Sequence, residues 1–373
     1  MRSKGCLVLV FLTGGLALAA GPCVPVPRQV LVAKPLPYPK NEDPSVLAYA
    51  AMTGDTAVDV LLPANQAASP QAVTVRVFVR GKHVETRELW LGGQLRVARE
   101  VDSTAGGRLA VSISSVAVSA DGSVVALQGF DRVLIFRGEE LRLSVPGVFP
   151  WDSVALTEDT FFFAPLVESP EKRLLYAHPL EGEGKPSPIL EPDTHDMKTH
   201  QLKLAVRSDQ KLWAVDAFTL KAWLLSRAGA VQRRYAPPDF LDEPPDVTEE
   251  NFRALEAYRA QAMGDATRKP PRVELRPASR REQVQALTTV GTKAVLIRNS
   301  PHEEEKKVRL LVLNESSGTW RCLLVPASGD GATLRGTSAG VFLVSPHETF
   351  FLPAELLEGD QPQRGEGARG GSF

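Results

Sequence analysis

Residues 116–145 read VAVSADGSVVALQGFDRVLIFRGEELRLSV, and this stretch decides how the rest of the chain is interpreted. Four short apolar runs alternate with turn residues. The first turn carries Asp121-Gly122, where glycine accepts a positive φ and the carboxylate can accept hydrogen bonds from nearby amides. β-Branched and aromatic residues fill the runs and favour half-buried strands, so the stretch predicts a four-stranded antiparallel meander. The expected strands are Val116–Val118, Ser123–Leu127, Val133–Phe136 and Leu141–Val145.

The same alternation of apolar runs and turns returns four times toward the C-terminus. The turn residues that mark the units are separated by 38, 50, 82 and 49 positions. A period of about 40–50 residues with four strands in each unit is typical of β-propellers. The interval of 82 positions equals one repeat plus an insertion, residues 236–271. The marker residues are Asp121, Asp159, Asp209, Gly291 and Gly340.

A helix is expected inside this insertion, over residues 246–263. Asp246 followed by Glu249 resembles a capping box, and Gly264 stands where a C-cap glycine would. Apolar side chains recur on one side at helical spacing. These are Phe252, Leu255, Tyr258 and Ala262.

Six blades fit between residues 45 and 357 once the insertion is set aside. Five repeats begin at or after Val116, so the preceding segment must supply the sixth blade. It contains a predicted hairpin, Ala72–Val79 followed by Val84–Leu91, with Gly81-Lys82 at the turn. Sharing of this blade with the C-terminal strand is the expected way to close the ring. The sequence therefore predicts an all-β, six-bladed β-propeller with a helical insertion.

Both ends of the chain differ from the predicted propeller. Residues 1–20 resemble a signal peptide, with Arg2 and Lys4 before an apolar core and a small-residue cleavage site near Ala19. An uncleaved anchor is the alternative for this segment. Prolines recur through residues 21–44, which predicts a stiff linker or a segment draped over the domain. Residues 358–373 are low in complexity and are expected to be disordered. We expect a mature chain without a transmembrane segment, exported to the periplasm or beyond the cell.

Two cysteines remain after signal removal, Cys23 and Cys322. Disulfides persist in exported proteins, so the two residues could form a bridge. Lipid attachment at Cys23 is a second reading, because residues 20–23 resemble a bacterial lipobox loosely. Two free thiols are the third, and the spacing alone does not choose among them.

The balance of charge excludes one class of partner. The chain has 43 Lys and Arg residues against 44 Asp and Glu residues, and these are scattered along the sequence. Nucleic-acid binding needs a concentrated basic face, so no nucleic acid is expected as a partner.

The densest group of potential metal ligands is the stretch 193–200. Asp193, His195, Asp196 and His200 could together bind a divalent metal such as zinc or manganese. Their spacing does not match a helical zinc site or a zinc finger, and a solvated loop between blades is the plainer interpretation. No other cofactor is expected.

Motifs for catalysis are missing from the sequence. There is no G-x-S-x-G, and neither remaining cysteine has a neighbouring histidine that would lower its pKa. No catalytic residue is therefore predicted. The five tryptophans are expected in the cores of the blades, with sugar-stacking or peptide-binding roles as the alternative. They are Trp90, Trp151, Trp213, Trp223 and Trp320.

The pattern SADGSVVAL…DRVLIF and its echo RSDQKLWAVDAFTLKAWLLS resemble six-bladed propellers of the NHL-repeat type found in exported bacterial proteins. That resemblance implies a binding scaffold more often than an enzyme, and it carries no site residues to this chain. Three functions follow as hypotheses. The first is a scaffold that binds a protein, peptide or glycan; the others are a metal-dependent hydrolase or lyase using residues 193–200, and a component of envelope assembly.

Overall fold

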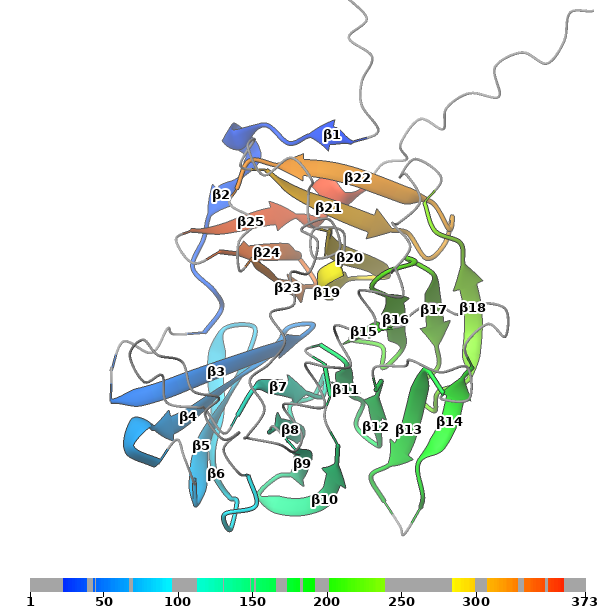
Figure 1. The fold of residues 1–373 in the computed structure, drawn as a ribbon. Coiled ribbons are helices and arrows are strands. Elements are labelled where there is room, and N and C mark those ends of the chain that lie inside the picture. The colour runs from blue at the N-terminus through cyan, green and yellow to red at the C-terminus, as the bar shows by residue number, and fades with distance from the viewer. Residues whose placement is uncertain are drawn as a thin grey trace, which may run out of the picture.

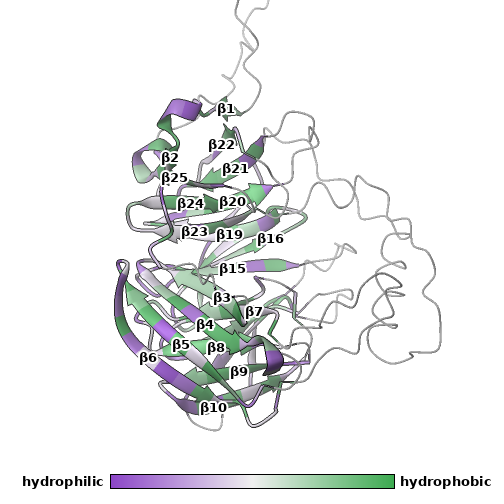
Figure 2. Ribbon diagram, turned by 90° about the vertical axis from the view of Figure 1, so that its left-hand side faces the viewer, coloured by the Kyte–Doolittle hydropathy of each residue, from purple (hydrophilic) through white to green (hydrophobic). Residues whose placement is uncertain are grey.

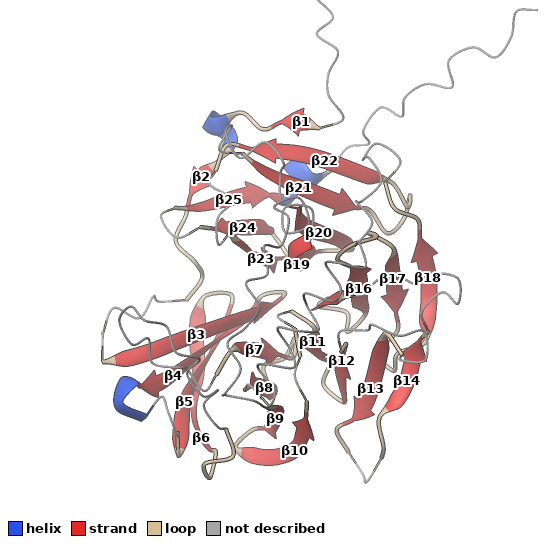
Figure 3. Cartoon of the chain, in the orientation of Figure 1, coloured by secondary structure: helices blue, strands red, loops and turns tan. Residues whose placement is uncertain are grey.

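The computed structural model describes a ring of strands around a central axis (Figure 1). Strands make up nearly all of its regular structure (Figure 3). Short 3₁₀ helices in the described part are η1 (Arg28–Val30), η2 (Ala64–Gln66) and η4 (Ala354–Leu357). The described residues are 23–38, 43, 45–66, 70–95, 113–129, 131–147, 149–150, 152–165, 173–181, 184–191, 201–238, 284–298, 307–327, 332–345 and 348–358.

Six antiparallel sheets form the blades, and the chain enters each blade at its innermost strand. The all-β six-bladed propeller predicted from the sequence is confirmed. Blade 1 is β3 (Val46–Thr53), β4 (Thr56–Pro63), β5 (Ala72–Val79) and β6 (Lys82–Trp90); blade 2 is β7 (Ser115–Val118), β8 (Val124–Gln128), β9 (Arg132–Arg137) and β10 (Glu140–Pro146); blade 3 is β11 (Val154–Leu156), β12 (Thr160–Phe163), β13 (Leu175–Pro179) and β14 (Ser187–Leu190). Blade 4 is β15 (Leu202–Val206), β16 (Leu212–Asp216), β17 (Ala222–Leu225) and β18 (Val231–Tyr235); blade 5 is β19 (Val284–Val290), β20 (Lys293–Arg298), β21 (Val308–Leu313) and β22 (Trp320–Val325); blade 6 contains β23 (Thr333–Thr337), β24 (Gly340–Val344) and β25 (Thr349–Pro353).

The meander from which the sequence was interpreted is blade 2. Its first turn has Gly122 at φ 77°, and the Asp121 carboxylate accepts hydrogen bonds from the Ser119 hydroxyl and the Ser123 amide. These contacts satisfy the turn locally, so the strands on either side can pair in register. The five repeats marked in the sequence correspond to blades 2 to 6.

The ring is closed by the N-terminal segment. Blade 6 has only three strands from its own part of the chain, and β2 (Val32–Ala33) pairs with β25 as its outermost strand. Just before it, β1 (Val24–Pro25) adds a fifth strand to blade 5 by pairing in parallel with β22. The proline-rich segment thus supplies outer strands to the last two blades, and the sharing falls in blade 6 instead of the first blade.

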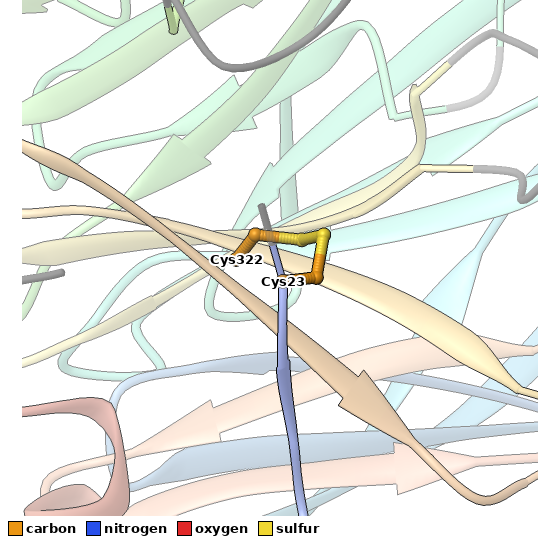
Figure 4. The surroundings of a disulfide bond; sticks show 2 residues. All are labelled: Cys23 and Cys322. Carbon is orange, nitrogen blue, oxygen red and sulfur yellow. A yellow bond between two sulfur atoms is a disulfide. The ribbon is translucent and has the colours of Figure 1, made fainter. Parts of the chain in front are cut away.

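A disulfide between Cys23 and Cys322 fastens this segment to blade 5 (Figure 4). The two residues are 299 positions apart in the sequence, and both are buried. Of the three readings that the sequence left open, the structure has the bridge. A sulfur atom held in a disulfide is not available for attachment of a lipid.

Five of the blade interfaces are apolar. Successive residues of a strand point to opposite faces, so each blade buries one set of side chains against the preceding blade and another against the next. In β16, Leu212 and Ala214 pack toward blade 3, while Trp213 and Val215 pack toward blade 5. Outer strands are more polar, as the hydrophilic stretches of β6 and β10 show beside the apolar β8 (Figure 2).

The sixth interface, between blades 6 and 1, is different, and we call it the seam. Residues 34–38 run from β2 toward β3 and contact both blades. Lys34 Nζ lies 4.5 Å from the centroid of the Phe351 ring in blade 6. Burial raises the pKa of Tyr38, and the nearby charge of Arg335 opposes that rise. On the side of blade 1, the buried Asp59 is ion-paired with Arg76. Charged and aromatic groups meet here instead of aliphatic ones.

Candidate functional site

A central channel with a volume of about 580 Å³ is the candidate functional site. Its wall is formed by the innermost strands of all six blades and the residues next to them. The inner strands contact one another in chain order, and β23 contacts β3 to complete the circle. Because each meander begins at the axis, the first strand of every repeat contributes to the same wall.

All six inner strands point the same way along the axis. The Thr53 hydroxyl at the end of β3 donates a hydrogen bond to the Val118 carbonyl at the end of β7, over 2.7 Å. In the same way, Thr289 near the end of β19 donates to the Val206 carbonyl, the last residue of β15. The first turns of the blades therefore gather at one end of the channel.

The turn of blade 1 closes that end. β3 and β4 have eight residues each, and the arrowhead of β3 reaches the middle of the ring (Figure 1). A Cβ built on Gly54, at the tip of this hairpin, would lie 3.4 Å from the Cβ of Ser208 in blade 4. Blade 4 stands opposite blade 1 in a six-bladed ring, so the hairpin crosses the axis. We call this the closed end.

Contacts with neighbouring blades hold the closing hairpin in place. The Asp55 carboxylate accepts hydrogen bonds from the amide and the hydroxyl of Ser338 in blade 6, both over 2.9 Å. Thr56 donates its hydroxyl hydrogen bond to the Ala120 carbonyl in blade 2. Gly54 has φ 59°, a left-handed conformation that glycine adopts without strain. The hairpin is thus anchored on both sides and at its tip.

At the opposite end, which we call the mouth, the chain enters each inner strand. Among the described strands, the widest separations in sequence fall at this end, from Trp90 to Ser115, from Leu190 to Leu202 and from Tyr235 to Val284, and most of the residues between them lie outside the described part. At the closed end, the connections run from Thr53 to Thr56 or, at the longest, from Pro179 to Ser187. Loops tolerate insertion and carry binding residues more often than tight turns do.

Asp152 is a charged residue at the mouth. It lines the channel with its side chain 39% exposed, and its backbone has φ 56°, an uncommon conformation for a residue other than glycine. Lys203 Nζ lies 3.9 Å from its carboxylate, and only 7% of the lysine side chain is exposed. Burial lowers the pKa of Lys203, and the charge of Asp152 opposes that shift. The pair adds little net charge to the mouth.

Further polar residues line the wall, among them Tyr49, Arg335 and Gln285 of β19. Tyr49 comes from β3, and burial raises the pKa of its phenol to about 12, so it stays neutral and can donate a hydrogen bond. Arg335 comes from β23, at the seam, and is half-buried. Otherwise alanine, serine, threonine and aliphatic residues dominate the lining.

The metal ligands predicted from the sequence, Asp193, His195, Asp196 and His200, lie outside the described residues, and so does the helix expected at 246–263. Within the described part, no group of three or more His, Cys, Asp and Glu residues could hold a metal ion. The metal site therefore stays a prediction.

The tryptophans that the structure describes do not line the channel. Trp213 and Trp320 are buried in the interface between blades 4 and 5, and Trp223 packs against the cluster between blades 3 and 4. Trp90, by contrast, is 66% exposed at the end of an outer strand. Asp152, Lys203 and Arg335 were not singled out in the sequence. Asp152 and Lys203 lie at or just before the start of an inner strand and Arg335 lies in the middle of one, and no local motif marks any of the three.

Comparisons with known proteins place this chain only by its fold. No family model matches it, and no curated protein matches it. Solved structures with a similar fold include a member of the DUF4221 family from Bacteroides vulgatus, with 11% identity, a TM-score of 0.48, and coverage of 86% of this chain and 96% of that one.

Two enzymes are also among the similar structures. The virginiamycin B lyase of Staphylococcus aureus has 8% identity and a TM-score of 0.38, with 83% and 95% of the two chains covered. A GH74 enzyme of Niastella koreensis has 10% identity and a TM-score of 0.45, with 82% of this chain and 45% of that one covered. Nothing about the function of the present chain follows from likeness at this level. In the described part of the chain, no helix is long and apolar enough to cross a membrane.

Proposed function

We propose that this chain is an exported, bacterial, NHL-like propeller that binds a peptide or a segment of a protein in the mouth of its central channel, without catalysing a reaction. The observation that carries the proposal is a channel lined by all six blades and blocked at one end by the β3–β4 hairpin. Its volume of about 580 Å³ falls within the range of roughly 300–1,000 Å³ that is usual for ligand pockets.

The lining favours a peptide over a glycan. Glycan sites usually offer aromatic faces to the sugar rings, and the described tryptophans lie elsewhere. The inner strands, in contrast, are edge strands, each with a single neighbour in its sheet. Backbone groups at such an edge are the ones that an extended peptide pairs with. Some of them bond to the neighbouring blade here, such as the Ala50, Val118 and Val206 carbonyls, and a peptide would pair with the others.

Export is supported by the disulfide between Cys23 and Cys322, because such bonds persist in oxidising compartments and are rare in the cytosol. Two other functions stay predictions. A metal-dependent hydrolase or lyase depends on residues 193–200, and metal analysis of the purified protein would test it. A role in envelope assembly would be tested by pull-down from an envelope fraction.

The experiment that tests peptide binding fills the channel. The purified protein is immobilised and exposed to a pool of random pentapeptides with free C-termini, and the retained peptides are measured by mass spectrometry. Ser115→Trp places a large side chain on the wall near the mouth. Ser144→Trp makes the same change on the exposed outer strand of blade 2 and serves as the control.

The expected result is retention by the native protein and by Ser144→Trp, and its loss in Ser115→Trp. Absence of retention by the native protein, or equal retention by both variants, would contradict binding in the channel. A parallel pool of linear oligosaccharides tests the ligand class, and stronger retention of that pool would replace the peptide by a glycan.

A further inference from the structure

The charges on the channel wall are not all compensated. Asp152 has Lys203 beside it, as described above. Arg335 has no carboxylate oxygen within 4.0 Å among the described residues, and its Nε atom is buried without a hydrogen-bond partner. Asp59 of blade 1, whose charge acts on Tyr38, is ion-paired with Arg76. The wall therefore contains one cationic group without an anionic partner.

Neutral acceptors hold the guanidinium of Arg335. Nη1 donates to the Thr333 hydroxyl over 3.1 Å and to the Leu334 carbonyl over 2.9 Å, and Nη2 donates to the Ala50 carbonyl over 3.3 Å. The phenol of Tyr38 also lies near the guanidinium, whose charge opposes the rise that burial causes in the pKa of that phenol. These contacts fix the orientation of the group without neutralising its charge, which is how a preorganised anion site is built.

Other arginines in the molecule show how unusual this arrangement is. Arg76, Arg87, Arg132 and Arg207 also have a buried Nε without an acceptor, but each has a carboxylate within ion-pair distance. A partly buried guanidinium is costly without a counterion. Arg335 differs from those four in belonging to the lining of the channel.

The closed end limits what can enter. Because the β3–β4 hairpin blocks the axis, a chain cannot thread through the ring and must enter the mouth with one of its ends. The end of a peptide that carries a negative charge is its C-terminal carboxylate. A carboxylate accepts charge-assisted hydrogen bonds, and Nη2 of Arg335 has one N–H beyond the bond to Ala50 that can donate such a bond.

We propose that the channel binds the C-terminal end of a peptide, with Arg335 recognising the terminal carboxylate. This inference rests on the proposed function and specifies which end of the peptide enters the channel. The residues before the carboxylate extend toward the mouth along the inner strands, each of which has a single neighbour in its sheet.

The test compares two pools of random pentapeptides that differ in one group. One pool ends in a free carboxylate and the other in a carboxamide, which removes the charge and keeps the shape. Retention of both pools is measured for the native full-length protein. We expect the free acids to be retained about tenfold or more above the amides, since hydrogen bonds to charged groups are the strong ones. Equal retention of acids and amides overturns the proposal.

Variants assign the effect to one side chain. Arg335→Gln should abolish the preference for acids, and Arg335→Lys, which keeps the charge, should retain part of it. Arg321→Gln is the matched control, because this arginine also donates to carbonyl oxygens but lies on β22, at the outside of blade 5. An unchanged preference in Arg335→Gln, or its loss in Arg321→Gln, contradicts the role of Arg335. Circular dichroism and melting curves confirm that each variant is folded.

Two further arms separate related outcomes. Acetate alone tests whether any small carboxylate suffices, and displacement of peptides by acetate at equal concentration would overturn recognition of a peptide end. Ser115→Trp separates this inference from the proposed function. If that variant loses retention while acids and amides bind equally well to the native protein, the channel remains the binding site and only recognition of the carboxylate is refuted.

Discussion

The interfaces between blades are of two kinds. Five are built from aliphatic and aromatic side chains that interdigitate between neighbouring sheets. The seam between blades 6 and 1 instead brings together Lys34, Tyr38, Asp59, Arg76 and Arg335. The comparison shows that five interfaces depend on apolar packing, whereas the seam gathers the charged and polar groups. Apolar packing holds neighbouring blades together at the five other interfaces. The seam is polar, and residues 34–38, which come from outside the blade repeats, run along it.

The largest difference in stability is expected when one phenylalanine side chain is truncated in an apolar interface and another is truncated at the seam. Phe162 is fully buried between blades 3 and 4, so Phe162→Ala should reduce the free energy of unfolding by about 3–5 kcal/mol. Phe351→Ala should reduce the free energy of unfolding by less than half as much, because Lys34 Nζ lies over that aromatic ring at the seam. Urea unfolding of both variants measures the two values. Equal costs would mean that the seam is packed as tightly as the apolar interfaces.

Loss of the disulfide comes next in size. The double variant Cys23→Ala and Cys322→Ala should lower the free energy of unfolding by about 2–4 kcal/mol, since the unfolded chain is no longer cross-linked. Hydrogen exchange should then accelerate first in β23–β25 of blade 6. The amides of blade 2, far from the N-terminal segment, are the internal control. A uniform increase over all blades would contradict a special weakness at the closure.

Two tyrosine hydroxyl groups allow a finer comparison. Tyr38→Phe removes a hydroxyl that lies near the charged guanidinium of Arg335, and should lower the free energy of unfolding by about 1.5 kcal/mol. Tyr235→Phe removes a hydroxyl that donates to the Glu315 carbonyl over 3.2 Å beside an apolar interface, and should cost about 0.5 kcal/mol. Thermal or urea denaturation of both variants gives the order. The reverse order would show that Arg335 does not depend on Tyr38.

The smallest expected effect concerns charges at the rim of an apolar interface. Burial alone would raise the pKa of Glu315, but the hydrogen bond and charge of Arg207, with Lys211, lower it below the usual range. The unfolded chain therefore binds more protons near the usual pKa of glutamate, and stability is lost as the pH falls through that region.

Glu315→Gln should flatten this acid limb by at most about 1 kcal/mol, because the pair is partly screened by solvent. Denaturation midpoints measured from neutral to acidic pH provide the check. An acid limb as steep in the variant as in the native protein would assign it to other carboxylates.

The fold could be predicted because its signals are local. Asp121-Gly122 and its counterparts mark the first turn of each blade, and residues such as Phe161 and Phe162 reveal strands buried on both faces. The strand that closes the ring could not be identified, because β2 has only two residues in a proline-rich segment without periodicity. Its partners lie at the other end of the chain.

Candidate site residues were harder to find for a related reason. Asp152 and Arg335 belong to different repeats and meet at the channel only through the ring. Nothing in the neighbouring sequence distinguishes them from surface charges. The sequence drew attention to His195 and His200 because ligands close together in the chain are easy to see. Residues brought together by tertiary structure are not.

The path of the N-terminal segment has a consequence for biosynthesis. The strands β1 and β2 leave the ribosome before any blade, yet their partners β22 and β25 are translated last. Cys23 has to wait with a free thiol until Cys322, 299 positions later, has been added. A nascent chain that stops short of its final blade stays an open arc with the apolar face of blade 5 uncovered. The ring can therefore close, and the disulfide can form, only after the whole chain has been made.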